Sequence, residues 1–172
     1  MNGIEITNAA EAYTGTSIKE DVALVAINEA LGRLGDMGFI YGQVTLENVE
    51  ANQWYRMPSD LTNILSVEDA NGDVYPDWWD RFDMIRFKDA GDKVIQARKL
   101  PERMLTLDET PDCPAAYHNV IVTYLRHFVL NSADERNAGR MRFDKFEQDA
   151  THIFNQLRRK RQPRQMKVMR HA

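Results

Sequence analysis

The chain has 172 residues, of which 28% are charged and 43% are hydrophobic, as in an ordinary globular domain or a domain with one inserted lobe. No apolar run approaches the roughly 20 residues that a bilayer crossing needs, and the first residues lack a basic region followed by an apolar one, so we expect a cytosolic protein with no membrane partner. Cys113 is the only cysteine, which excludes an internal disulfide and a thiolate zinc cluster.

The first part of the chain predicts an arm followed by a helix. Residues 1–16 alternate only weakly before they become small and polar, and we expect a flexible arm there. Ser17 and Glu20 have the spacing of a capping box, which predicts a helix over 18–35. The apolar residues of this helix recur at i, i+3, i+7 and i+10, as Leu24, Ile27, Leu31 and Leu34.

Between residues 44 and 107 the hydrophobic period changes from helical to two, which indicates strands. We predict four to six short antiparallel strands in this β lobe. They include 49–57, 64–69, 82–87, 93–99 and 104–107. Asn71-Gly72 is a strong hairpin signal after the second of these.

The most apolar helix is predicted over 116–131, after the loop Pro111–Pro114. One wide apolar face is formed at i, i+3, i+4, i+7, i+8 and i+11 by Tyr117, Val120, Ile121, Tyr124, Leu125 and Phe128. A helix that is apolar on most sides is a central helix with other elements packed around it. We therefore expect it to form the core.

A third helix is predicted over 133–161, with a capping box at Ser132 and Glu135 and an end by Pro163 at the latest. Gly139 is expected to weaken it. The predicted fold class is therefore α+β, mainly α: a three-helix bundle with an inserted antiparallel β lobe. The predicted units are the arm at 1–16, the body at 17–161 with its lobe at 44–107, and an extended basic tail at 162–172.

Cys113 and His118 are the residues nearest to a catalytic pattern. Their separation of five residues allows a Cys-His nucleophile pair, but the sequence offers no oxyanion donors and no third, orienting group. His118 shares an apolar helix face, which is typical of a buried imidazole, and a loop thiol is the simpler interpretation of Cys113. No phosphate-binding glycine loop is present. We expect neither enzymatic activity nor a cofactor.

The segment 69–80 partly matches a calcium-binding loop, with acids or amides at its first, third and fifth positions and an acid at its twelfth. The sixth position, where such a loop needs glycine, is Val74. The hairpin explains the segment without an ion and is favoured, while calcium stays an alternative. Trp78 and Trp79 either close the core of the sheet or bind a partner, and we keep both as candidate partner-binding residues.

The end of the chain has a charge opposite to the rest. From residue 158 onward there is no acid, whereas the preceding 157 residues hold 15 bases against 26 acids, a net charge of −11. The seven bases are Arg158, Arg159, Lys160, Arg161, Arg164, Lys167 and Arg170. Such a segment is either a solvated end or binds polyanions or an acidic protein surface. The apolar Met166, Val168 and Met169 among the bases favour a protein groove as well as phosphate.

Three stretches carry a resemblance to a known family over about residues 17–172. They are WYRMPSDL at 54–61, the hairpin with its aromatic residues at 75–79, and LTLDETPDCPAAYHNVIV at 105–122. Followed by a long helix and a basic extension, they resemble the tail adaptor, or head-to-tail connector, proteins of tailed bacteriophages, especially short-tailed ones. Residues 1–16 correspond to no part of this family pattern.

The resemblance implies a non-enzymatic virion protein of the phage neck that is assembled in the host cytoplasm. Such adaptors form a ring, commonly dodecameric, beneath the portal, and DNA passes through it without sequence-specific binding. It also implies that the C-terminal extension grips the portal and that the β lobe meets the next tail or nozzle component. The alternatives are a nucleic-acid-binding regulator that uses the basic tail and a small hydrolase built on Cys113 and His118.

Overall fold

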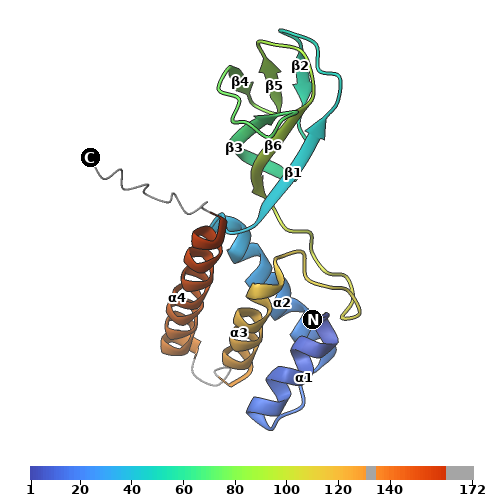
Figure 1. Cartoon of the computed structure of the whole chain (residues 1–172). Coiled ribbons are helices and arrows are strands. Elements are labelled where there is room, and N and C mark those ends of the chain that lie inside the picture. The colour runs from blue at the N-terminus through green and yellow to red at the C-terminus, as the bar shows by residue number, and fades with distance from the viewer. Residues whose placement is uncertain (131–134, 162–172) are drawn as a thin grey trace, which may run out of the picture.

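The computed structural model describes residues 1–130 and 135–161, with side chains described for 1–130 and 144–158. It has a helical body at one end and a β lobe at the other (Figure 1). The body contains α1 (Gly3–Thr14), α2 (Glu20–Asp36), the short 3-10 helix η1 (Ala115–Tyr117), α3 (His118–Leu130) and α4 (Glu135–Arg161). In the described part of the chain, no helix is both long enough and apolar enough to span a bilayer.

The predicted flexible arm is wrong, because residues 3–14 form α1. Asn2 caps this helix: its side chain accepts a hydrogen bond from the backbone of Glu5, whose own side chain bonds back to Asn2. Ile6 and Ala10, one helical turn apart, are completely buried in the core. Two buried apolar residues give only a weak periodic signal in the sequence. The helix is stabilised by its packing against α3. With four α-helices and two sheets in the described residues, the fold is mixed α+β and not the predicted three-helix bundle.

The α2 helix has nearly the predicted bounds but a different start. Its N-cap is Lys19, which makes no capping side-chain hydrogen bond, so the box predicted at Ser17 and Glu20 does not form. The chain is held instead by Glu11, whose carboxylate accepts a hydrogen bond from the backbone of Ile18 at 2.6 Å. The contact between α1 and α2 therefore fixes this helix start.

The α3 helix is the centre of the body, as its apolar pattern predicts. Ile121, Tyr124 and Leu125 are at most 1% exposed. The core around α3 also receives Ile6 and Ala10 from α1, Ala26, Ile27 and Leu31 from α2, and Phe146 and Ala150 from α4. The α4 helix continues through Gly139 without the expected interruption. The capping box predicted at Ser132 lies outside the described residues.

The β lobe consists of two three-stranded antiparallel sheets with the orders β1-β6-β3 and β2-β5-β4. The strands are β1 (Tyr41–Leu46), β2 (Trp54–Arg56), β3 (Leu61–Asp69), β4 (Trp78–Arg81), β5 (Met84–Phe87) and β6 (Lys93–Lys99). A separate apolar core lies between the sheets and is formed by Val49, Met57, Val67, Ile85, Phe87 and Ile95. The lobe therefore has its own source of hydrophobic stabilisation.

Several strand predictions need correction. The alternation over 49–57 includes only a three-residue strand, Trp54–Arg56, and the first strand, Tyr41–Leu46, was missed. Residues 104–107 form a loop whose Met104 and Leu107 pack on the helical core, which explains why they resemble a strand. The turn at 69–73 forms, but β4 belongs to the other sheet, so the predicted hairpin reduces to one bridge between Glu68 and Val74.

Replacing Ile6 by alanine tests whether α1 belongs to the core. We expect Ile6→Ala to lower the free energy of unfolding by about 2–5 kcal/mol, since a buried isoleucine would leave a cavity. Ile4→Ala is the matched control: Ile4 lies on the same helix but is 41% exposed, and its loss should cost less than about 1 kcal/mol. Urea unfolding followed by circular dichroism measures both, and equal effects would mean that α1 does not pack as described.

Candidate functional site

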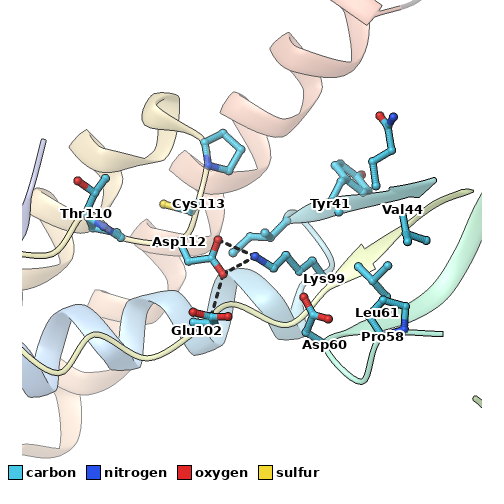
Figure 2. Close-up of a pocket in the computed structure, with 15 residues that line it drawn as sticks. Tyr41, Val44, Pro58, Asp60, Leu61, Lys99, Glu102, Thr110, Asp112 and Cys113 are labelled. Carbon is cyan, nitrogen blue, oxygen red and sulfur yellow. Dashed lines mark hydrogen bonds and ion pairs between the residues drawn. The ribbon is translucent and has the colours of Figure 1, made fainter. Parts of the chain in front are cut away.

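A groove of about 740 Å³ lies where the β lobe joins the helical body. Figure 2 shows its two walls, the bases of β1 and β6 on one side and the loop Pro111–Pro114 on the other. The apolar part of the wall includes Tyr41, Val44, Pro58 and Leu61, and the polar part includes Asp60, Lys99, Glu102 and Asp112. The groove is thus formed by segments from three distant parts of the sequence.

The polar centre of the groove is an ion pair between Lys99 of β6 and Asp112 of the loop. Lys99 Nζ lies 2.8 Å from one Asp112 oxygen and donates a hydrogen bond of 2.9 Å to the other. Asp112 also accepts a hydrogen bond from the backbone of Glu102 at 2.9 Å (Figure 2). The hydrogen bond that Lys99 donates to Asp112 raises the pKa of Lys99. Both charged groups already have a partner. The ion pair is therefore better suited to connecting the lobe with the body than to catalysis.

Cys113 and His118 lie in the body beside this groove, but their protonation states do not suit nucleophilic catalysis. Burial, with a smaller contribution from the Asp112 charge, raises the pKa of the Cys113 thiol to about 12. Burial also lowers the pKa of His118, and its Nδ1 is 2.9 Å from the amino group of Met1. A reactive cysteine needs the opposite shift, toward the thiolate. The structure thus supports the interpretation of Cys113 as a loop thiol, partly buried against the helical core.

The calcium-like segment is organised by its first residue. Asp69 Oδ1 accepts hydrogen bonds from the backbone of Asn71 and Asp73, at 2.9 and 3.0 Å. These bonds, that from Asp73 foremost, lower the pKa of Asp69. The carboxylate therefore closes the turn, as the hairpin interpretation requires. Among the side chains described, those of residues 1–130 and 144–158, no three of His, Cys, Asp or Glu converge as a metal site would need.

Trp78 and Trp79 have different roles, because neighbouring residues of a strand point to opposite faces. Trp78 packs against the core of the lobe with Phe87 and Tyr75. Trp79 is 45% exposed on the other face of its sheet. Only Trp79 of the two is therefore available to a partner.

Trp79 belongs to a row of side chains that sequence reasoning missed. In the sheet β2-β5-β4, Trp54 pairs with Arg86 and Arg86 pairs with Trp79. The Arg86 guanidinium carbon lies 5.0 Å from the Trp54 ring centre and 4.9 Å from that of Trp79, within the range of cation–π attraction. The alternation of each strand is visible in the sequence, but the row itself requires the order of the strands.

A second row lies on the same face, two residues away from the first row on each of the three strands. Arg56 pairs with Met84 and Met84 with Arg81. We call these two rows the outer face. It consists of Trp54, Arg56, Trp79, Arg81, Met84 and Arg86.

The predicted basic residues begin on the last turns of α4. Arg158 is exposed, and Arg159, Lys160 and Arg161 complete the helix. Arg164, Lys167, Met169 and Arg170 lie outside the described residues, as does the whole segment 162–172 that we expect to be extended. The segment 162–172 therefore begins at the C-terminal end of α4.

That point lies at the junction of body and lobe. Phe154, near the end of α4, stacks on Phe39 at 4.6 Å between ring centres and lies 6.2 Å from the ring of Tyr41. Both partners belong to the segment that leads from α2 into β1 (Figure 1). The described end of α4 therefore lies beside the base of the lobe.

Comparison with known proteins adds no constraint on the site. No protein-family model matches the chain, and the search of curated proteins found no match.

Cys113 provides a test of the protonation states. With a pKa near 12, its rate of alkylation should still be rising about tenfold per pH unit at pH 10, whereas glutathione levels off above the ordinary thiol pKa of about 8.5. Iodoacetamide labelling followed by mass spectrometry measures this, with Cys113→Ala as the control for other nucleophiles. Because the folded state holds the thiol proton more tightly, its stability should fall as pH rises above the unfolded pKa. A rate that levels off near pH 8 would contradict the assignment.

The ion pair at the groove has a separate test. Lys99→Met and Asp112→Asn should each destabilise the protein, and the double variant should lose less than the sum. We expect a coupling energy of about 0.5–1 kcal/mol, because both side chains are partly exposed. Urea unfolding of the four proteins of this double-mutant cycle measures it. Strict additivity would show that the pair does not hold the lobe to the body.

Proposed function

We propose that this protein is a structural adaptor of a tailed-phage virion, a subunit of a ring that joins the portal to the tail. The observation that carries the proposal is the basic extension that begins at Arg158 and leaves an otherwise acidic molecule at one defined point. A subunit of this kind can attach to a neighbouring protein through an extension that becomes ordered on contact. The resemblance in the sequence supports the same conclusion.

The arrangement of the elements fits this role. The α4 helix is anchored by Phe154 against Phe39, so the extension starts from a rigid position. The lobe has its own core and extends away from the body (Figure 1), which leaves it available to a different partner. We assign the extension to the portal and the lobe to the next tail component. The protein would then be located in the virion neck.

Deletion of residues 162–172 tests the proposal directly. We expect the truncated protein to stay folded, since the described core ends before this segment, but to lose binding to the portal ring. Electron microscopy and sedimentation of mixtures with candidate phage portals measure docking. Binding should weaken as salt rises, because exposed charges are screened beyond about 8–10 Å at physiological ionic strength.

Two controls decide the interpretation. Arg164→Gln, Lys167→Gln and Arg170→Gln together should reproduce the loss, whereas Lys19→Gln, Lys88→Gln and Arg103→Gln should not, since these three are exposed bases elsewhere on the chain. Undiminished docking of the truncated protein would overturn the role of the extension. Salt-sensitive DNA binding by a monomer that ignores portals would instead support the nucleic-acid-binding regulator, for which the run of seven bases is the favouring observation.

A further inference from the structure

The outer face of the β2-β5-β4 sheet is extended by one unusual residue. Phe82 is 96% exposed in the two-residue turn between β4 and β5, and its φ of 57° lies in the left-handed region that favours glycine. A bulky residue in this conformation costs on the order of 1–3 kcal/mol. Arg81 lies 5.9 Å from its ring centre. The turn thus presents an exposed aromatic ring beside Arg81, at the end of the outer face, at a cost in backbone strain.

Two arginines of the outer face have no counter-charge in the described part of the chain. Arg86 Nε is buried and has no hydrogen-bond partner there, and neither Arg81 nor Arg86 takes part in an ion pair, unlike Arg56, which bonds Asp83 at 2.9 Å. Tryptophan, arginine and methionine are the residues most enriched in protein interfaces. The composition of this face is therefore that of an interface with an acidic partner.

A complementary surface lies on the helical body. A shallow groove of about 570 Å³ runs along α4, and its described lining contains two acids and no Lys or Arg. Its residues are Met37, Asp144, Glu147, Gln148, Thr151, His152 and Asn155. Within the described residues neither Asp144 nor Glu147 forms an ion pair, whereas nearby Asp149 is bonded by Lys145. Two carboxylates without a partner thus match the two arginines.

We propose that the outer face of one copy packs on the α4 groove of a second copy. Arg81 and Arg86 meet Asp144 and Glu147, and the exposed aromatic rings contact Met37, whose thioether packs well on aromatic edges. A helix laid on an open sheet face is the standard way to cover such a face. This inference rests on the proposed adaptor ring, because a contact between two different faces repeats from copy to copy and closes into a ring when the rotation allows.

A polynucleotide is the less favoured occupant of the outer face. Binding to nucleic acid depends on many phosphate contacts, and this face offers two unpaired arginines in a lobe where acids outnumber bases between residues 41 and 99. The surrounding potential would repel a polyanion. A protein surface with a few carboxylates around an apolar residue matches the face better.

Charge reversal in the full chain tests the contact. We expect Arg81→Glu, Arg86→Glu and Glu147→Arg each to weaken self-association about tenfold or more, because each brings like charges together. The combination Arg86→Glu with Glu147→Arg should restore association, since this pair is rebuilt with its signs exchanged. Arg103→Glu and Asp108→Arg, both exposed outside the two faces, are the matched controls. Sedimentation velocity over a concentration series measures association, and circular dichroism checks the fold.

The outcomes separate this inference from the proposed function. If the wild-type chain forms rings and all three reversals form them equally well, the interface is wrong while the adaptor proposal stands. A wild-type chain that stays monomeric at every concentration overturns the proposed interface. The adaptor proposal is then tested by the portal-docking experiment alone. An Arg86→Glu protein that loses binding to a single-stranded oligonucleotide but assembles normally would assign the outer face to nucleic acid instead.

Discussion

The burial of α3 is the interaction on which the rest of the structure depends. Its residues contact all three other helices of the body, and Ile121, Tyr124 and Leu125 are almost completely removed from water. Each such side chain contributes on the order of 1.5–3 kcal/mol of transfer free energy. For example, the rings of Tyr124 and of Phe146 of α4 pack edge to face, with 5.1 Å between the ring centres. Without this core α1 and α4 would lose the apolar contacts with α3 that help to fix their positions.

A second set of aromatic contacts connects this core to the lobe. Phe39, in the segment between α2 and β1, lies between Tyr117 at the start of α3 and Phe154 of α4, at 6.3 and 4.6 Å between ring centres. The Lys99–Asp112 pair ties the returning strand to the loop that precedes α3. The lobe is therefore attached through both of its connections to the body. This attachment allows one molecule to offer distinct surfaces at a defined separation, which is what a connecting protein requires.

The distribution of charge gives these surfaces their character. Most acids of the described residues are exposed and give the body and the lobe a negative balance. Of the 22 bases, seven lie from residue 158 onward and three lie on the outer face of one sheet. The unpaired Arg81 and Arg86 carry no stabilising ion pair in the described part of the chain. Together with Phe82, which is exposed in a strained turn, they indicate a surface kept for contact and not for the stability of a single subunit.

The sequence by itself determined the elements whose apolar period is long and regular. It predicted α2, α3 and α4 within a few residues, because each repeats its pattern over three or more turns. It also predicted β3 and β6, which contain β-branched residues and are bounded by turn residues. It failed for α1, because only Ile6 and Ala10 among its four buried residues are hydrophobic side chains of the core. It likewise assigned a strand to 104–107, since alternating residues that pack on a helical core resemble those of a sheet.

Only the tertiary structure decided which candidate residues come together. The sequence named Trp78 and Trp79 as one pair, whereas strand geometry packs the first partly against the lobe core and exposes the second. It placed Trp54 and Arg86 more than thirty residues apart, and the order β2-β5-β4 brings them into one row with Trp79. Register and strand order are set by contacts between distant segments, which no local pattern encodes. The basic composition of the chain end, by contrast, is local, and the sequence alone was enough to identify it.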